Sequence, residues 1–273
     1  MRHIILHHHI FKNAGTTLDS ALETHFGAAF TTLHNGTSGV VTNDMLASFL
    51  FDNHNIFALS SHHFQCQKYF SMDGNMRFFN LALLRDPVER ILSMYAFYRR
   101  TQSADMLSIS AKEKDINAFL EFIIGRFPHI ADNWQTNILA NHGFYCRPVS
   151  NADLAKASKR YSKFSLCATV DRYDEAMVML EHILYPTFPS KPIDFAYIAQ
   201  NVTTYQNRSE ELSVSNIRPK LLESFRELNR FDLLLCEYAR VELERRYRTI
   251  PNRDSRLGEF RDRCAKLQSA QMV

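Results

Sequence analysis

The sequence predicts an α/β fold, a three-layer sandwich in which a central parallel sheet has helices on both faces. Strand-length apolar segments occur at 3–10, 56–60, 78–84 and 164–169. The third segment is almost uninterruptedly apolar, which is typical of a parallel strand that is covered on both faces. Three of the four segments lead into helical spacing of apolar residues. Such alternation favours a parallel sheet whose ligands bind beyond the carboxyl ends of its strands.

The first predicted strand is joined to a helix by a polar turn at 13–15. The helix is expected to bury the face that carries Leu18, Ala21, Leu22, His25 and Phe26. Thr16 and Asp19 stand three residues apart and form an N-terminal capping pattern. The loop therefore ends at a helix N-terminus.

The strands at 78–84 and 164–169 also lead into helices with predicted caps. After the first of these, Asp86 is expected as the N-cap, Pro87 as the first helical residue and Glu89 as the third. The buried stripe of this helix is expected to carry Val88, Ile91, Leu92 and Tyr95. After the second strand, Asp171 is expected to cap a helix that buries Ala176, Met179, Leu180, Ile183 and Leu184.

With 273 residues, 45% of them apolar, the chain can bury a large core. It contains no repeat, no low-complexity run and no obvious linker. We therefore expect a single domain over 1–273, with 248–273 as a polar helical extension. The five cysteines are odd in number and widely spaced, which indicates reduced structural thiols rather than a zinc or redox motif.

The net charge of +3 is too small to indicate a nucleic-acid binder, so no nucleic-acid partner is expected. The Arg-rich stretch at 240–263 is typical of a solvated helix face. Residues 1–10 are apolar but interrupted by histidines, so they have neither the core of a signal peptide nor the length of a membrane span. We expect a cytoplasmic protein without a membrane span.

The loop after the first strand carries the residue types of an anion site, namely Lys12, Asn13, Ala14, Gly15, Thr16 and Thr17. Gly15 permits close backbone approach, the helix-start amides point outward, and Lys12 adds a mobile positive charge. A glycine followed by two threonines is also common as a simple helix cap, which is the alternative without a ligand. A P-loop NTPase places its lysine after the last glycine, whereas here Lys12 precedes Gly15.

This loop resembles the 5′-phosphosulfate-binding loop of sulfotransferases that use 3′-phosphoadenosine 5′-phosphosulfate (PAPS), in particular their carbohydrate-type branch. The family loop reads approximately Pro-Lys-x-Ala-Gly-Thr-Ser/Thr, and Phe11 stands here in place of the proline. The resemblance implies a P-loop-NTPase-like sandwich, PAPS as cosubstrate and 3′-phosphoadenosine 5′-phosphate (PAP) as product. It assigns residues 12–17 to the phosphosulfate, with Lys12 neutralising the leaving oxygen.

A second motif, Arg-Asp-Pro-x-x-Arg-x-x-Ser, begins at Arg85 and ends at Ser93. It resembles the second nucleotide-binding element of the same family, which implies that Arg85 and Ser93 hold the 3′-phosphate. In physical terms, Arg85 follows a strand end, where its guanidinium group can donate two hydrogen bonds to a phosphate, and Ser93 lies almost two turns into the helix. The alternative is a surface ion pair of Arg85 with Asp86 and a solvated Ser93. The order of the two motifs, each at a strand-to-helix junction, favours nucleotide binding.

Between the two motifs, Ser61, His62 and His63 follow a predicted strand end. This segment resembles the Gly-His segment of uronyl and heparan sulfate 2-O-sulfotransferases, with Ser61 in place of the glycine. The resemblance implies that His62 is the catalytic base, and His63 is the alternative. An imidazole with an unperturbed pKa of about 6.5 can accept the proton of an acceptor hydroxyl near neutral pH.

His7, His8 and His9 are expected to be packed or hydrogen-bonded rather than catalytic. Successive strand residues point to opposite faces, and no carboxylate or thiolate accompanies this run in the sequence, so zinc is the weaker alternative. We expect no metal, because a lysine and helix-start amides can stabilise a leaving phosphate.

Two other fragments resemble family segments. Residues 132–137 are similar to an Asn-x-Gln-Thr segment near the active cleft, where Trp134 is either a sugar-stacking residue or a buried aromatic. Arg208 lies where the family often has a loop over the nucleotide, which implies a nucleotide contact.

Together, the motifs predict an enzyme that transfers a sulfuryl group from PAPS to an acceptor hydroxyl, on a carbohydrate by resemblance. A phosphoryl-transferring kinase would need a metal-binding acid and a Walker-type lysine, and neither pattern is found. The alternative from another class is a catalytically inactive nucleotide-binding or interaction module. Retention of Lys12, Arg85, Ser93 and His62 argues against it.

Overall fold

The computed structural model describes residues 1–35, 39–65, 76–188, 193–199 and 212–270. The chain folds into two compact units. The first comprises Met1–Leu84, Ser158–Gln200 and Tyr238–Val273, and the second comprises Arg85–Ala157 and Asn201–Glu237. Two helices, α8 (Asn151–Tyr161) and α11 (Arg230–Tyr247), contribute residues to both units.

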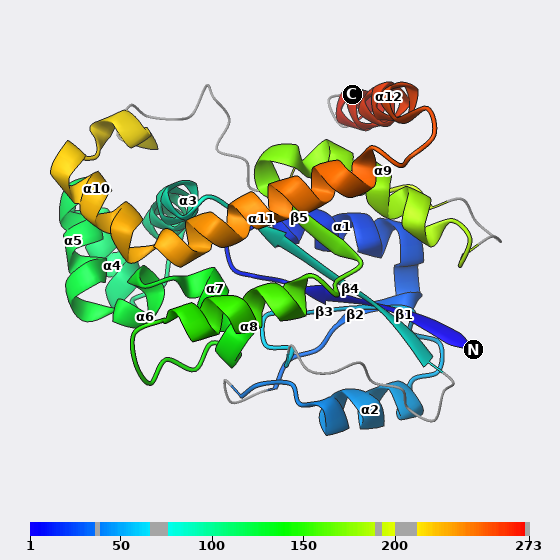
Figure 1. Ribbon diagram of the computed structural model, residues 1–273, viewed down its shortest axis with the longest axis horizontal. Helices are drawn as coiled ribbons and strands as arrows, with labels where there is room; N and C mark the ends of the chain where they lie inside the picture. The colour runs from blue at the N-terminus through cyan, green and yellow to red at the C-terminus, as the bar shows by residue number, and fades with distance from the viewer. Residues whose placement is uncertain (36–38, 66–75, 189–192, 200–211, 271–273) are drawn as a thin grey trace. The chain divides into compact units, whose positions relative to one another are not determined.

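A parallel sheet forms the centre of the first unit (Figure 1). Within the described residues its strands are β1 (Arg2–His8), β2 (Phe30–Thr32), β3 (Ala58–Ser61), β4 (Met76–Leu84) and β5 (Leu166–Thr169), in the order β2-β3-β1-β4-β5. All neighbouring strands are parallel, and β1 pairs with β3 on one side and β4 on the other. The direction of winding therefore reverses at β1. In such folds ligands bind in the crevice beyond the carboxyl end of the strands at this point.

Helices cover both faces of the sheet (Figure 1). On one face, α1 (Gly15–Phe26) and α9 (Tyr173–Leu184) share a core with the sheet that includes Ile5, Leu22, Leu83 and Leu180. On the opposite face, α2 (Asn43–Asp52) contributes to a second core, whose members include Ile4, Leu6, Leu46, Leu50 and Leu59. Because side chains alternate along β1, its consecutive apolar residues serve both cores. The predicted three-layer α/β sandwich is confirmed.

The start of α1 differs from the predicted capping pattern. Its N-cap is Ala14, which has φ 58° and ψ 19° in the left-handed region, and no side chain caps the helix. Thr16 cannot be the N-cap, because the helix already begins at Gly15. The carboxylate of Asp19 instead binds two histidines near the end of β1.

The predicted cap of α9 is also wrong. A short 3-10 turn, η2 (Val170–Arg172), follows β5, and the helix begins only at Tyr173 without a side-chain cap. The carboxylate of Asp171 accepts a hydrogen bond from Nε of Arg240 at 3.2 Å. A partner that is distant in the sequence thus replaces the local cap.

The described part of the second unit is helical. Its elements include α3 (Pro87–Arg100), α4 (Met106–Glu113), α5 (Ile116–Arg126), α6 (Pro128–Ala131), α7 (Trp134–Asn141), the 3-10 turn η4 (Val214–Asn216) and α10 (Pro219–Leu228). The predicted start of α3 is confirmed. Asp86 is its N-cap and accepts hydrogen bonds from the amides of Val88 at 2.8 Å and Glu89 at 3.2 Å. The predicted stripe of Val88, Ile91, Leu92 and Tyr95 is buried.

The C-terminal part of the first unit contains α12 (Arg253–Ala270), which confirms the helix predicted within 248–273. Phe260 of this helix is fully buried and belongs to the same core as α9. The four described cysteines, Cys146, Cys167, Cys236 and Cys264, carry free thiols, and Cys66 lies outside the described residues. None of the described helices is both long enough and apolar enough to cross a bilayer.

Candidate active site

The loop from β1 to α1 lies beyond the carboxyl end of the central strand. Two of its residues, Lys12 and Ala14, have positive φ angles of 67° and 58°. The buried side chain of Asn13 donates a hydrogen bond from Nδ2 to the carbonyl oxygen of Leu83, at 2.8 Å. This bond fixes the loop to the end of β4, so the loop has a defined shape.

The N-terminus of α1 lies at the end of this loop. The first amides of a helix have no partners within it and carry the positive end of the helix dipole, which favours an anion. Because the cap residue is Ala14, the two threonines do not serve as the N-cap. Thr16 is exposed, whereas Thr17 is buried. The loop is therefore not a threonine-capped turn, and its role as an anion site stays a prediction.

His62 follows β3 and contacts the first residue of this loop. Its Nδ1–H donates a hydrogen bond to the carbonyl oxygen of His9 at 2.6 Å, and the two rings lie 4.1 Å apart between centroids. A carbonyl can only accept, so the proton of the neutral ring is on Nδ1 and the lone pair is on Nε2. Burial, and next the neighbouring His9, lower the pKa of His62 to about 4, which keeps the ring neutral near pH 7.

His63 has a different environment. Its backbone amide donates to Oγ of Ser61 at 3.1 Å, while its exposed ring lies edge-on to that of His62, 6.2 Å away. Burial, followed by the charge of His34, lowers the pKa of His63. The bond to the His9 carbonyl that orients the ring of His62 therefore distinguishes it from its neighbour.

The histidine run near the end of β1 is paired with a carboxylate, contrary to expectation. Nδ1 of His7 donates to Oδ1 of Asp19 at 2.6 Å, and Nδ1 of His9 donates to Oδ2 at 2.7 Å. His8 points to the other face, where its Nε2 lies 2.9 Å from Oδ1 of Asn80. The carboxylate was missed because Asp19 stands on α1, ten or more residues along the chain. The packed and hydrogen-bonded role predicted for the run is confirmed.

In the second unit, Gln135 holds the main chain of Arg85 from both sides. The amide of Arg85 donates to Oε1 of Gln135 at 2.9 Å, and Nε2 of Gln135 donates to the carbonyl oxygen of Arg85 at 2.8 Å. The guanidinium group lies 3.6 Å from the carboxylate of Glu89, and not on Asp86, which caps α3. Ser93 is half-buried, and its hydroxyl makes no hydrogen bond to any described residue.

A buried carboxylate holds Gln135 in the position from which it bonds the main chain of Arg85. Asp232 accepts hydrogen bonds from the amides of Gln135 at 3.0 Å and Thr136 at 2.7 Å, and from the Thr136 hydroxyl at 2.7 Å. Burial raises the pKa of Asp232, and these bonds oppose the rise. Gln135 and Asp232 thus organise the start of the Arg85 motif.

Trp134 in the same segment is half-buried. Its ring lies 5.7 Å from the guanidinium of Arg90, and its Nε1 is buried. Burial lowers the pKa of Arg90 to about 10, while Asp232 opposes that shift. Because Trp134 is half-buried, both interpretations of its role stay predictions.

The sequence matches a family model described as the sulfotransferase family over residues 1–239. The chain belongs to the sulfotransferase family. No curated protein matches it significantly. The matched region contains the β1–α1 loop, His62 and the motif from Arg85 to Ser93, and it ends within α11. The activity of this enzyme is therefore the transfer of a sulfuryl group.

The structure of this sulfotransferase describes all but one of the residues that the motifs singled out. Lys12, the rest of the β1–α1 loop, His62 and His63 belong to the first unit, whereas Arg85 and Ser93 begin the second. Arg208 lies outside the described residues. The sequence did not predict the supporting contacts of these residues, which come from His9, Asp19, Gln135 and Asp232. Only Gln135 carried a signal, the resemblance of its segment to a family motif.

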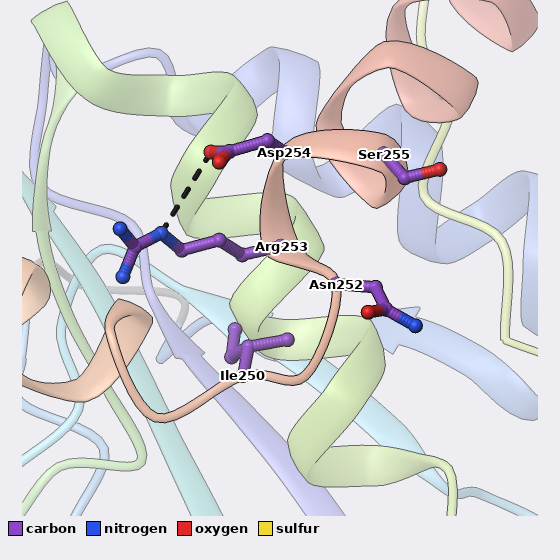
Figure 2. A pocket seen from close by; sticks show the side chains of 5 residues that line it. All are labelled: Ile250, Asn252, Arg253, Asp254 and Ser255. Carbon is purple, nitrogen blue, oxygen red and sulfur yellow. Dashed lines mark ion pairs between the residues drawn. The ribbon is translucent and has the colours of Figure 1, made fainter.

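A depression of about 570 Å³ in the first unit of the sulfotransferase lies at the turn between α11 and α12 (Figure 2). It is lined by Ile250, Asn252, Arg253, Asp254 and Ser255. Nε of Arg253 lies 3.7 Å from Oδ1 of Asp254, so the basic group of this depression faces an acid. None of the motif residues lines it, and it falls outside the matched region. We assign it no part in sulfuryl transfer.

Proposed function

We propose that this sulfotransferase uses PAPS as the donor and a carbohydrate hydroxyl as the acceptor. The observation that carries the proposal is the position of His62, whose ring contacts His9 at the start of the β1–α1 loop and presents Nε2 as an acceptor. The open N-terminus of α1 and Lys12 supply positive potential for the 5′-phosphosulfate. The resemblance of the Ser61-His62 step to 2-O-sulfotransferases supports a carbohydrate acceptor.

In the proposed reaction, Nε2 of His62 takes the proton of the acceptor hydroxyl while its oxygen attacks sulfur. The new S–O bond forms as the bond from sulfur to the 5′-phosphate oxygen breaks, and the electron pair of that bond stays on the phosphate. PAP leaves, and His62 returns its proton to solvent. Lys12 and the amides of α1 stabilise the charge that develops on the leaving oxygen, so the step requires no metal ion.

The other motif residues hold the donor in this proposal. Arg85 and Ser93 bind the 3′-phosphate, and Arg208 is a further nucleotide contact. Residues 13–17 surround the 5′-phosphosulfate, and Asn13 holds the loop in shape through the bonds of its side chain to Leu83 and of its amide to Ile10. The exposed hydroxyl of Thr16 is available to the ligand at the helix start.

The direct test measures transfer from PAPS to a panel of polysaccharides and simple alcohols by His62→Ala, His63→Ala and the unaltered enzyme. A general base contributes about 10²- to 10⁴-fold to rate, so we expect that loss for His62→Ala with unchanged PAP affinity. His63→Ala is the matched control and should keep its activity. If His63→Ala is inactive and His62→Ala is active, the base is His63.

Ligand binding separates the remaining alternatives. A ligand that binds only the folded state stabilises it by about 2.7 kcal/mol at one hundred times its dissociation constant, so PAP should raise the melting temperature where ATP with Mg²⁺ does not. A response to ATP with Mg²⁺ alone would favour a kinase. Stabilisation by PAP without transfer to any acceptor would favour an inactive module.

A further inference from the structure

His62 is held in place by His9 through two different contacts. The carbonyl oxygen of His9 fixes the position of the Nδ1–H of His62 at 2.6 Å, and the His9 ring packs against the His62 ring at 4.1 Å between centroids. Rotation of the His62 side chain would break both contacts. The orientation of Nε2 therefore depends on where the main chain and the ring of His9 lie.

His9 is itself fixed by Asp19. Nδ1 of His9 donates to Oδ2 at 2.7 Å, and the other carboxylate oxygen receives Nδ1–H of His7 at 2.6 Å. Burial opposes ionisation of Asp19, but the two hydrogen bonds hold its pKa well below the usual range. An ionised carboxylate can only accept, so both histidines carry a proton on Nδ1. The side chain of Asp19 is only 17% exposed, which shields these charge-assisted bonds from water.

The other edge of His9 lies against the first residue of α1. A Cβ atom added to Gly15 would come within 2.1 Å of Cδ2 of His9 and 2.4 Å of its Nε2. The imidazole of His9 thus lies beside the Cα of Gly15, and it also contacts the Asp19 carboxylate and the His62 ring. One side chain joins the anion-binding end of α1 to the proposed base.

Two imidazoles and a carboxylate are also a ligand set for zinc, and the three groups converge within 4.8 Å of one another. The observed spacing is that of hydrogen bonds. Ligand atoms about 2.1 Å from a tetrahedral zinc ion lie about 3.4 Å apart. The two N–O separations here are 2.6 Å and 2.7 Å, which are hydrogen-bond lengths.

We propose that His9 and Asp19 are positioning residues that hold the base His62 at a fixed place beside the phosphosulfate loop. The inference rests on the proposed function, because it assumes that His62 takes the proton. Proton transfer and in-line attack need donor and acceptor atoms aligned, and a displacement of about 1 Å can cost about 100-fold in rate. Asp19, bonded to His9 from α1, couples the helix that receives the phosphosulfate to that alignment.

The test compares three single variants. His9→Phe keeps an aromatic ring and the backbone carbonyl but loses the hydrogen bond to Asp19. Asp19→Asn keeps the shape of the side chain but can no longer accept a hydrogen bond from both histidines. His8→Gln is the matched control, because His8 is adjacent in sequence and faces Asn80 instead. We expect kcat to fall about 10- to 100-fold in the first two variants and not in the control. PAP affinity from calorimetry should stay within about twofold in all three.

A double variant separates positioning from a purely structural role. If Asp19 acts through His62, then Asp19→Asn combined with His62→Ala is no slower than His62→Ala alone. A further loss equal to that of Asp19→Asn would overturn the proposal, as would normal kcat in both His9→Phe and Asp19→Asn. One zinc ion per chain, lost in His9→Phe, would overturn it in favour of a metal site. A fully active His62→Ala contradicts the proposed function itself, so the two failures are distinguishable.

Discussion

At the residue scale, the ring of His9 occupies the space that a side chain on residue 15 would need. Gly15→Ala would place a Cβ 2.1 Å from Cδ2 of His9, and the ring must move away from it. We expect this substitution to destabilise the fold by about 1–3 kcal/mol, as overpacking does, and to lower kcat because His62 loses its support. Urea unfolding and the PAPS transfer assay measure the two effects.

The control variant removes the His9 ring. In a His9→Ala background, Gly15→Ala should cost less than about 0.5 kcal/mol, because the three atoms nearest to the new Cβ, all in the His9 ring, are absent. A Gly15→Ala variant with unaltered stability and turnover would show that the His9 ring is free to lie elsewhere. The sequence had indicated only that Gly15 permits approach of an anion, and the packing of His9 is a second reason for glycine.

The pH dependence of transfer is a second prediction at this scale. His9, His63 and the Asp19 carboxylate face His62, and burial followed by His9 lowers the pKa of His62 to about 4. The base therefore stays neutral down to that pH, so we expect the acid limb of kcat/KM near pH 4 and not at the usual 6.5. An acid limb near 6.5 would assign the proton transfer to another group.

Unfolding at low pH must be separated from this effect. The folded pKa of His62 lies below its unfolded value, so the unfolded state binds the extra proton first. The stability associated with His62 is therefore lost as the pH falls from 6.5 to about 4. Circular dichroism at each pH distinguishes unfolding from loss of the base. His62→Gln should show a weaker fall in stability over the same range.

At the scale of elements, α7 and α11 together position the start of α3. Gln135 on α7 holds both main-chain groups of Arg85, and Asp232 on α11 holds the amide of Gln135. We expect Gln135→Ala to weaken PAP binding about 3- to 10-fold, since each lost hydrogen bond contributes about 0.5–1.5 kcal/mol. Arg85→Ala should cost more, about 1.5–3 kcal/mol, because it removes a charged phosphate contact.

Calorimetry with PAP tests this order. Asn137→Ala is the matched control, because Asn137 is buried on the same helix but bonds Asn141 and not Arg85. It should leave PAP affinity unchanged. Equal PAP affinity in Gln135→Ala and the unaltered enzyme would show that Arg85 keeps its position without the two hydrogen bonds to Gln135. Unchanged PAP affinity in Arg85→Ala would show that Arg85 does not bind the 3′-phosphate.

The helix starts show what a sequence can predict at this scale. The start of α3 was predicted correctly because its cap is local: Asp86 accepts hydrogen bonds from amides two and three residues later. The start of α1 was predicted wrongly because Asp19 has partners on another element. Asp171 failed for the same reason, since Arg240 lies 69 residues away. A carboxylate near a helix start favours a cap until a stronger distant partner competes for it.

At the scale of the whole molecule, the alternation of strands and helices was enough to predict the parallel sheet and its two helical layers. The motifs at strand ends predict Lys12, His62 and Arg85 as site residues. The supporting residues His9 and Asp19 were not found as a pair, because their contact depends on how α1 packs against β1. Local chemistry thus predicts which residues form the site, while tertiary packing determines what holds them in place.

The C-terminal helix α12 gives a prediction for the stability of the first unit. It lies beyond the matched family region and was predicted only as a polar extension, yet Phe260 is fully buried and Arg263 contacts Glu181 of α9 at 2.8 Å. We expect Phe260→Ala to lower the free energy of unfolding by about 3–5 kcal/mol, because it leaves a cavity in the core shared with the sheet. Leu267→Ala, on the same helix at a 40% exposed position, should change it by less than about 0.5 kcal/mol. Urea unfolding followed by circular dichroism measures the stability of both variants. Equal urea midpoints for Phe260→Ala and the unaltered enzyme would show that α12 does not contribute to the stability of the first unit.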